Sequence, residues 1–188
     1  VSVGAITWCH SGHLFHNIFL PGALAVNQMC RAHLELFRSN PLFALNRPLS
    51  YMTVINNMLE VLRELNKLDE VEAYIELLSG IKTNNDRDQG GKLIYLTHHY
   101  MWYYMRCGKY TEAVSVADSE NLRLKTYTKY KKDSVIYQLM MIAIVYITAK
   151  EWDKANNAIY ELMAVTKSGV REDILEHTKM LQLIVQVA

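Results

Sequence analysis

The sequence predicts an all-α protein built from stacked helical hairpins. Apolar residues recur three and four positions apart along much of the chain, which is the spacing of one helical face. The stretch from Leu49 to Ala188 contains no proline, the residue that most strongly interrupts a helix. A six-residue pattern that begins at Asn66 returns 42 residues later, and again after another 42. These three observations favour a series of helices joined by repeated turns, with few long strands.

The N-terminal region, residues 1–49, is expected to be helical and to lie outside the repeats. Within it, Leu24 to Arg38 has the spacing of an amphipathic helix. This helix should end at Asn40, because the ring of Pro41 disfavours helical geometry in the residue before it.

Further helices are expected on both sides of one clear loop. Ser50 is the expected N-cap of the first of them. The segment Gly80 to Gly91 clusters Gly, Asn and Asp, which favour turns, and is therefore predicted to be a loop. A strongly apolar helix should open at Asp133 or Ser134, and a last one near Glu172.

The 42-residue repeat corresponds to three units of helix, tight turn and helix. The six-residue segments begin at Asn66, Gly108 and Lys150, and we expect these residues to form the turns. Sliding the chain by 42 also superposes apolar positions within the helices: Met58 with Tyr100 and Ile142, Leu62 with Tyr104 and Tyr146, and Ile75 with Ala117 and Ile159. The superposition predicts that the units bury equivalent residues.

These units resemble the tetratricopeptide (TPR) family of helical-hairpin repeats. The residues that carry the match best are a tyrosine near the end of the first helix and a Gly-x-Tyr-x-x-Ala turn: Tyr104, Gly108, Tyr110 and Ala113, followed in the next unit by Tyr146, Trp152 and Ala155. The chain would be a divergent, TPR-like member, because its period is 42 residues rather than about 34.

The resemblance implies a right-handed α-α superhelix over residues 50–188, a TPR-like solenoid of stacked hairpins. Its units would span about 52–93, 94–135 and 136–177, with a partial fourth unit at 178–188. Such stacks leave a long inner surface, lined by the first helix of each hairpin, on which extended peptides or partner helices bind.

The residues expected on that inner surface are first-helix positions that face neither the hairpin partner nor the next repeat. Aromatic residues and arginine are over-represented at binding hot spots, and methionine adapts to irregular partners. For Met140 the alternative is that another helix, such as the N-terminal one, covers it. The candidate partner-binding residues are Asn56, Glu60, Arg63, Tyr95, His98, Trp102, Arg106, Tyr137 and Met140.

No set of residues with recognised spacing points to catalysis, a metal or a cofactor. A zinc site is not expected among Cys9, His10, His13 and His16, because three histidines spaced three apart fan around a helix and converge poorly. The segment Asn84 to Gly90 resembles a calcium loop, but Gln89 stands where the sharp turn needs glycine. Phosphate-binding loops, nucleophile elbows and metalloprotease signatures are absent from the sequence. We therefore expect a protein that is not an enzyme.

Charge and cysteine usage limit the partners and the compartment. Twenty basic and 19 acidic residues give a net charge of +1, so nucleic acid is not an expected partner despite the basic segment Arg123 to Lys132. No stretch reads as a signal peptide or a membrane-spanning helix. Three cysteines without close spacing make a poor disulfide framework, and a cytoplasmic location is expected.

The expected function is a non-catalytic scaffold that binds a protein or peptide partner on its inner surface. The alternative is a regulatory or sensor module of a larger transcriptional or signalling protein. Homo-oligomerisation is a further expectation, because the end of the solenoid should expose apolar residues. These are Ile174, Leu181, Leu183, Ile184 and Val185.

Overall fold

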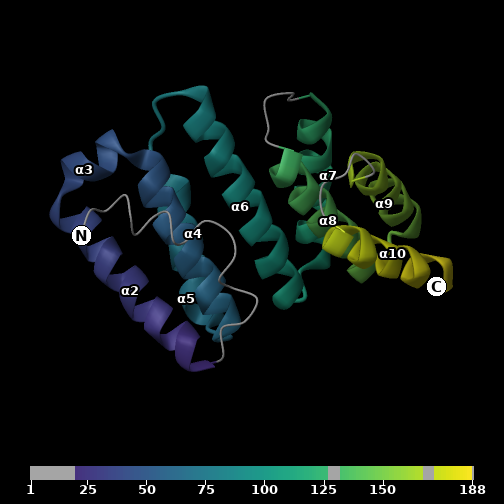
Figure 1. Cartoon of the computed structure of the whole chain (residues 1–188), viewed down its shortest axis with the longest axis horizontal. Helices are drawn as coiled ribbons and strands as arrows, with labels where there is room; N and C mark the ends of the chain where they lie inside the picture. Colours follow the sequence, from purple (N-terminus) through teal and green to yellow (C-terminus); the bar gives the residue numbers. More distant parts are fainter. Residues whose placement is uncertain (1–19, 127–131, 167–171, 188) are drawn as a thin grey trace. The chain divides into compact units, whose positions relative to one another are not determined.

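The described part of the chain is almost entirely helical. A computed structural model describes residues 20–126, 132–166 and 172–187, and within them the chain forms nine helices and no strand (Figure 1). Their bounds are α2 Leu20–Ser39, α3 Pro41–Asn46, α4 Pro48–Glu64, α5 Leu68–Gly80, α6 Asp86–Arg106, α7 Tyr110–Thr126, α8 Lys132–Thr148, α9 Trp152–Thr166 and α10 Glu172–Val187. The predicted all-α class is confirmed.

The helices form two compact units, Val1–Leu96 and Thr97–Ala188, and the boundary between these units lies inside α6. In the first unit, α4 packs against both α2 and α5. The core of the first unit combines the apolar face of α4 with buried residues of α2 and α5. The α4 residues are Met52, Ile55, Met58, Leu59 and Leu62, the α2 residues are Cys30, Leu34 and Phe37, and the α5 residues are Val71, Ile75 and Leu78.

In the second unit, α8 packs against α7, α9 and α10, and α10 also packs against α9. Helix α8 is apolar on all sides because it is surrounded in this way. Two core clusters result. The larger contains Met101, Ala113, Ala117, Ile142, Ala143, Val145, Tyr146, Ala155, Ala158 and Ile159. The smaller contains Ile136, Leu139, Leu162 and Ile174.

The three predicted hairpin turns are confirmed, and they have the same geometry. Asn66, Gly108 and Lys150 have φ angles of 54°, 71° and 61°, in the left-handed region that commonly ends a helix. At each turn the residue's amide donates to the carbonyl three residues back, at 3.1 Å, and the next amide donates to the carbonyl five residues back. Those second acceptors are Leu62, Tyr104 and Tyr146, at 2.9, 2.8 and 2.8 Å. The 42-residue repeat is therefore a repeat of backbone conformation.

The second helices of the three hairpins also bury equivalent residues. Small or aliphatic side chains are almost fully buried at two positions after each turn residue. Five residues after it these are Val71, Ala113 and Ala155, and nine residues after it they are Ile75, Ala117 and Ile159. Tyr110, the tyrosine of the Gly-x-Tyr-x-x-Ala match, is exposed.

The predicted N-cap at Ser50 is wrong. Helix α4 begins at Pro48, with Arg47 as its N-cap, so Ser50 lies inside the first turn. Proline is favoured there because its missing N–H has no partner in a helix's first turn in any case. Helix α8 is described from Lys132, directly after residues outside the described part, so the predicted start at Asp133 or Ser134 stays a prediction.

The predicted loop at Gly80 to Gly91 is shorter than expected, because α6 begins at Asp86. The Asn85 side chain accepts a hydrogen bond from the Asp88 amide at 2.9 Å and donates one to the Asp88 carboxylate at 2.9 Å. These bonds satisfy free donors at the start of the helix, so the Asn and Asp residues of this segment begin a helix.

Candidate partner-binding surfaces

The predicted binding residues of the first unit lie on α4 and at the middle of α6. Asn56, Glu60 and Arg63 follow one another along one side of α4, and all three are half-buried, as is Tyr95 on α6. The Arg63 guanidinium and the Glu60 carboxylate form an ion pair at 2.5 Å. This pair orders both side chains along the helix.

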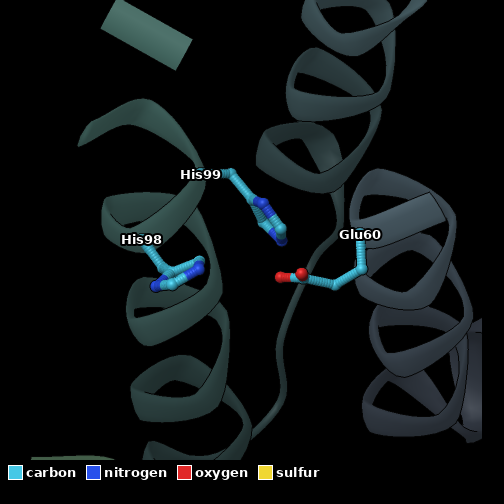
Figure 2. Close-up of side chains that lie close together, drawn as sticks. All are labelled: Glu60, His98 and His99. Carbon is cyan, nitrogen blue, oxygen red and sulfur yellow. The ribbon is translucent and has the colours of Figure 1, made fainter. Parts of the chain in front are cut away.

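The predicted binding residues of the second unit include three on α6. His98 and Trp102 are half-buried, and Arg106, in the last turn of the helix, is exposed. His98 lies beside His99, with the two rings edge to face at 5.3 Å between centroids. Figure 2 shows His98, His99 and Glu60. The two histidines lie on the part of α6 that belongs to the second unit, and Glu60 belongs to the first unit.

The two predicted binding residues on α8 differ in exposure. Tyr137 is 40% exposed. Met140 is partly buried and packs against the smaller core cluster, which includes Leu162 of α9 and Ile174 of α10. Besides α8 itself, the helices at this cluster are α9, α10 and, through Leu124, α7.

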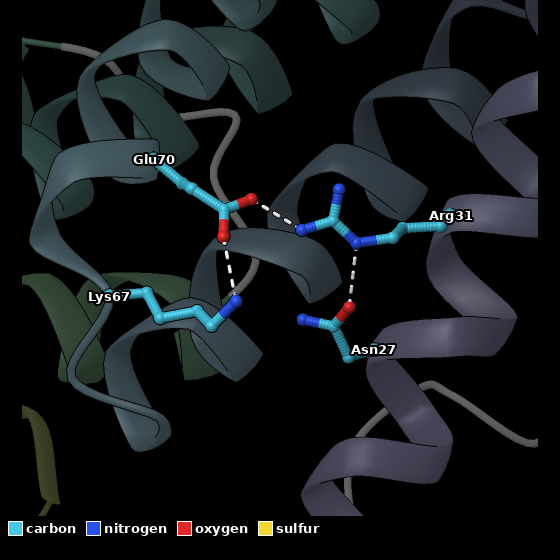
Figure 3. Close-up of polar contacts among 4 residues, drawn as sticks. All are labelled: Asn27, Arg31, Lys67 and Glu70. Atoms are coloured by element: carbon cyan, nitrogen blue, oxygen red, sulfur yellow. Dashed lines mark hydrogen bonds and ion pairs between the residues drawn. The ribbon is translucent and has the colours of Figure 1, made fainter.

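A polar network ties the N-terminal helix α2 to the first hairpin. Arg31 on α2 forms an ion pair with Glu70 on α5, and its Nε atom donates to Asn27 Oδ1 at 2.8 Å (Figure 3). Lys67, which follows the hairpin turn, donates to the other Glu70 oxygen at 2.9 Å. These hydrogen bonds, from Lys67 first and then Arg31, lower the pKa of Glu70. The network is a structural link, because each charged group in it has an opposite charge beside it.

A second network lies in the second unit and uses the tyrosine that precedes the third turn. The Tyr146 hydroxyl donates to Asp118 Oδ1 at 2.8 Å, and Lys154 donates to both Asp118 oxygens at 3.1 and 2.9 Å. The Lys154 ammonium also lies 5.6 Å from the centroid of the Tyr146 ring. Burial, followed by the bond to Asp118, raises the pKa of Tyr146. The network joins α7, α8 and α9.

Glu120 is the most buried carboxylate in the described part of the chain. Arg123, one helical turn later, donates to it from Nε at 2.7 Å and from Nη2 at 2.5 Å. Burial raises the pKa of Glu120, while the bonds from Arg123 oppose that effect. A carboxylate held in this way by its own helix is a structural group.

An exposed apolar surface, of which the sequence predicted only Leu183 and Ile184, runs along α10. Met180, Leu183, Ile184 and Val187 are 56%, 60%, 50% and 86% exposed, and their spacing places them on one line of the helix. We call these four residues the α10 stripe. The spacing i, i+3, i+4 and i+7 was a signal that could have revealed it.

The exposure of the α10 side chains also corrects the prediction that five apolar residues near the end of the chain are exposed. Ile174 is buried, and Leu181 and Val185 are partly buried and pack against the larger core cluster. Of the five residues expected to be exposed, only Leu183 and Ile184 are. Helix α10 has two apolar sides, and the sequence could not show which of them packs on α8 and α9.

Part of the chemistry considered from the sequence lies outside the described residues. This applies to Cys9, His10, His13 and His16, and to most of the basic segment after Arg123. Among the helices that the structure describes, none is both long and apolar enough to cross a bilayer. No protein-family model matches the chain, and no curated protein and no solved structure matches it.

Proposed function

We propose that this protein is a non-catalytic interaction module that binds a peptide or helix of another protein along its first helices. The observation that carries this proposal is the same turn geometry at Asn66, Gly108 and Lys150, 42 residues apart. A hairpin that repeats in this way stacks on its neighbours and presents a continuous row of first helices. The resemblance to TPR-like solenoids is part of the proposal.

In the second unit, Trp102, Arg106 and Tyr137 are the proposed contact residues. Each belongs to a residue type that dominates binding energy at protein interfaces. Arg106 is exposed at the end of α6, and its guanidinium can donate two parallel hydrogen bonds to a carboxylate of the partner. Trp102 lies one helical turn before it and supplies apolar surface. The partner should therefore carry an apolar anchor beside an acidic side chain.

Two features support a binding role rather than catalysis. The carboxylates Asp118 and Glu120 are engaged by Lys154 and Arg123 in structural ion pairs. The same unit keeps an aromatic side chain, Tyr137, 40% exposed on the apolar helix α8. A partner that covered Tyr137 would remove this aromatic surface from water.

A peptide-display selection on the full chain tests the proposal. Peptides selected on the unmodified protein should bind at least about tenfold more weakly to Arg106→Glu and to Tyr137→Ala. Tyr160→Ala is the matched control, because Tyr160 is an exposed tyrosine of the same unit on α9. Circular dichroism should be the same for all variants. Equal loss of binding in Tyr160→Ala, or no loss in the two surface variants, would overturn the proposal.

A further inference from the structure

Helix α10 has an inner apolar side that is packed and an outer apolar side that is exposed. Ile174 and Thr178 on the inner side are buried, and Leu181 and Val185 pack on the larger core cluster. The outer side is the α10 stripe, whose side chains are 50% to 86% exposed. The described part of the chain thus leaves one full line of this helix in contact with water.

The 42-residue repeat shows what normally lies against this line. One repeat earlier, the equivalent positions on α8 are Gln138, Met141, Ile142 and Val145, of which three are almost fully buried and one is partly buried. Three repeats earlier, the equivalent positions on α4 are Val54, Asn57, Met58 and Val61, and all four are buried.

In both of those hairpins the second helix lies against the first. Helix α9 packs on α8, and α5 packs on α4. Ile142 and Val145 of α8 belong to the same core cluster as Ala155, Ala158 and Ile159 of α9. Ala113 and Ala117 of α7 belong to that cluster as well. The α10 stripe therefore corresponds to a surface that packed helices, among them a hairpin's second helix, cover elsewhere in this chain.

The area of the α10 stripe indicates whether a second copy of the chain or a single helix is the partner that covers it. Four partly exposed aliphatic side chains offer on the order of half of the roughly 800 Å² per partner that a stable dimer buries. One amphipathic helix needs only anchors at i, i+3, i+4 and i+7, which is the spacing the stripe presents. Helix α10 already packs against α8 and α9, so a helix on the stripe would continue an interface that the chain makes internally.

We propose that the α10 stripe binds an amphipathic helix of a partner protein whose contact face is like that of α9. That face combines two small residues, Ala155 and Ala158, with the larger aliphatic residues Ile159 and Leu162, and all four are buried. Alanines allow two helix axes to approach closely, and the larger residues fill the spaces between the stripe's side chains. This site is independent of the surface at Trp102 and Arg106.

A labelled peptide with the sequence of α9, residues 152–166, is the probe. Its binding to the full chain is followed by fluorescence anisotropy, with a scrambled peptide of the same composition as the negative probe. Because isolated helices of this length are marginal in water, the affinity should be modest, with a Kd on the order of micromolar. Ile184→Lys should weaken binding at least about tenfold, because it places a charge in the centre of the stripe.

The matched control is Gln186→Lys, which adds the same charge to the same helix at an exposed position off the stripe. It should leave the Kd unchanged, and circular dichroism should report equal helix content in both variants. A photo-crosslinker in the peptide should label residues of α10.

Four results would overturn the proposal. These are no binding, equal binding of the scrambled peptide, binding that survives Ile184→Lys, and crosslinks to α8 that show exchange with the chain's own α9. Light scattering of the chain alone adds a fifth. A dimer that Ile184→Lys dissociates would make a second copy the occupant. None of these results bears on Arg106→Glu, so this proposal and the proposed function fail separately.

Discussion

Replacing Lys150 by glycine should stabilise the second unit, and replacing Gly108 by alanine should destabilise it. Both residues hold the left-handed turn conformation, with φ angles of 61° and 71°. An L-residue with a side chain pays roughly 1–2 kcal/mol for that conformation, whereas glycine adopts it freely. A Cβ atom added to Gly108 would meet nothing within 4 Å, so no steric clash adds to the backbone strain there.

The expected size follows from two opposing terms. Removing the strain at Lys150 gains roughly 1–2 kcal/mol, and the greater freedom of glycine in the unfolded chain costs roughly 0.4–1 kcal/mol. The net gain in the free energy of unfolding should be about 1 kcal/mol, and Gly108→Ala should lose a similar amount. For a chain of 188 residues, about 1 kcal/mol shifts Tm by roughly 2–4 °C.

Urea unfolding in a Trp8→Phe background, followed by circular dichroism and by the fluorescence of the remaining Trp102 and Trp152, measures this effect, since both tryptophans lie in the second unit. Lys150→Ala is the control, because it removes the same side chain but keeps the strained backbone. It should change stability little. If Lys150→Gly and Lys150→Ala gave the same result, or if Gly108→Ala were neutral, the shared turn geometry would not be the source of the effect.

Three further predictions concern polar groups and thiols. Tyr146→Phe should lower the free energy of unfolding by about 1 kcal/mol, because it removes the hydroxyl that donates to Asp118 at 2.8 Å; an unchanged urea midpoint would contradict this. Cys107 is exposed and should react with iodoacetamide well before Cys30, because burial raises the pKa of the Cys30 thiol to about 11. Peptide mass spectrometry measures the order of labelling. Earlier labelling of Cys30 would contradict this prediction and show that α2 opens. The pKa of Glu70 is lowered in the folded state. The charged carboxylate therefore stabilises the first unit when the pH lies above the ordinary pKa of glutamate, and this stabilisation is lost as the pH falls from about 5 to about 3. Its two cationic partners are largely exposed to solvent, so Glu70→Gln should remove at most about 1 kcal/mol of that acid sensitivity; an identical pH profile in the variant would refute the assignment.

The turns could be predicted from the sequence because they depend on local chemistry. The 42-residue repeat located all three, and glycine at 108 and asparagine at 66 are among the few residues that tolerate the positive φ found there. Lys150 is an unfavourable residue for this conformation, and only the repeat located it. The backbone hydrogen bonds then follow from the turn itself.

The start of α6 and the orientation of α10 depend on tertiary structure and could not be predicted in the same way. Asparagine and aspartate favour turns and helix N-caps equally, so Asn85 and Asp88 fitted both a loop and a helix start. Helix α10 offers apolar residues on two sides, including Leu181 and Ile184. Packing on α8 and α9 selects the side with Leu181, which a periodic pattern alone does not reveal.

The indole N–H signals of two tryptophans offer the most direct test of a binding surface on the first helices. Trp102 lies on the first helix α6, and Trp152 lies at the start of the second helix α9, both within the second unit. We expect a peptide selected on the full chain to shift the Trp102 indole resonance in an NMR titration and to leave the Trp152 resonance unchanged. A shift of Trp152 alone, or of neither signal at saturating peptide, would contradict a partner-binding role for the first-helix surface.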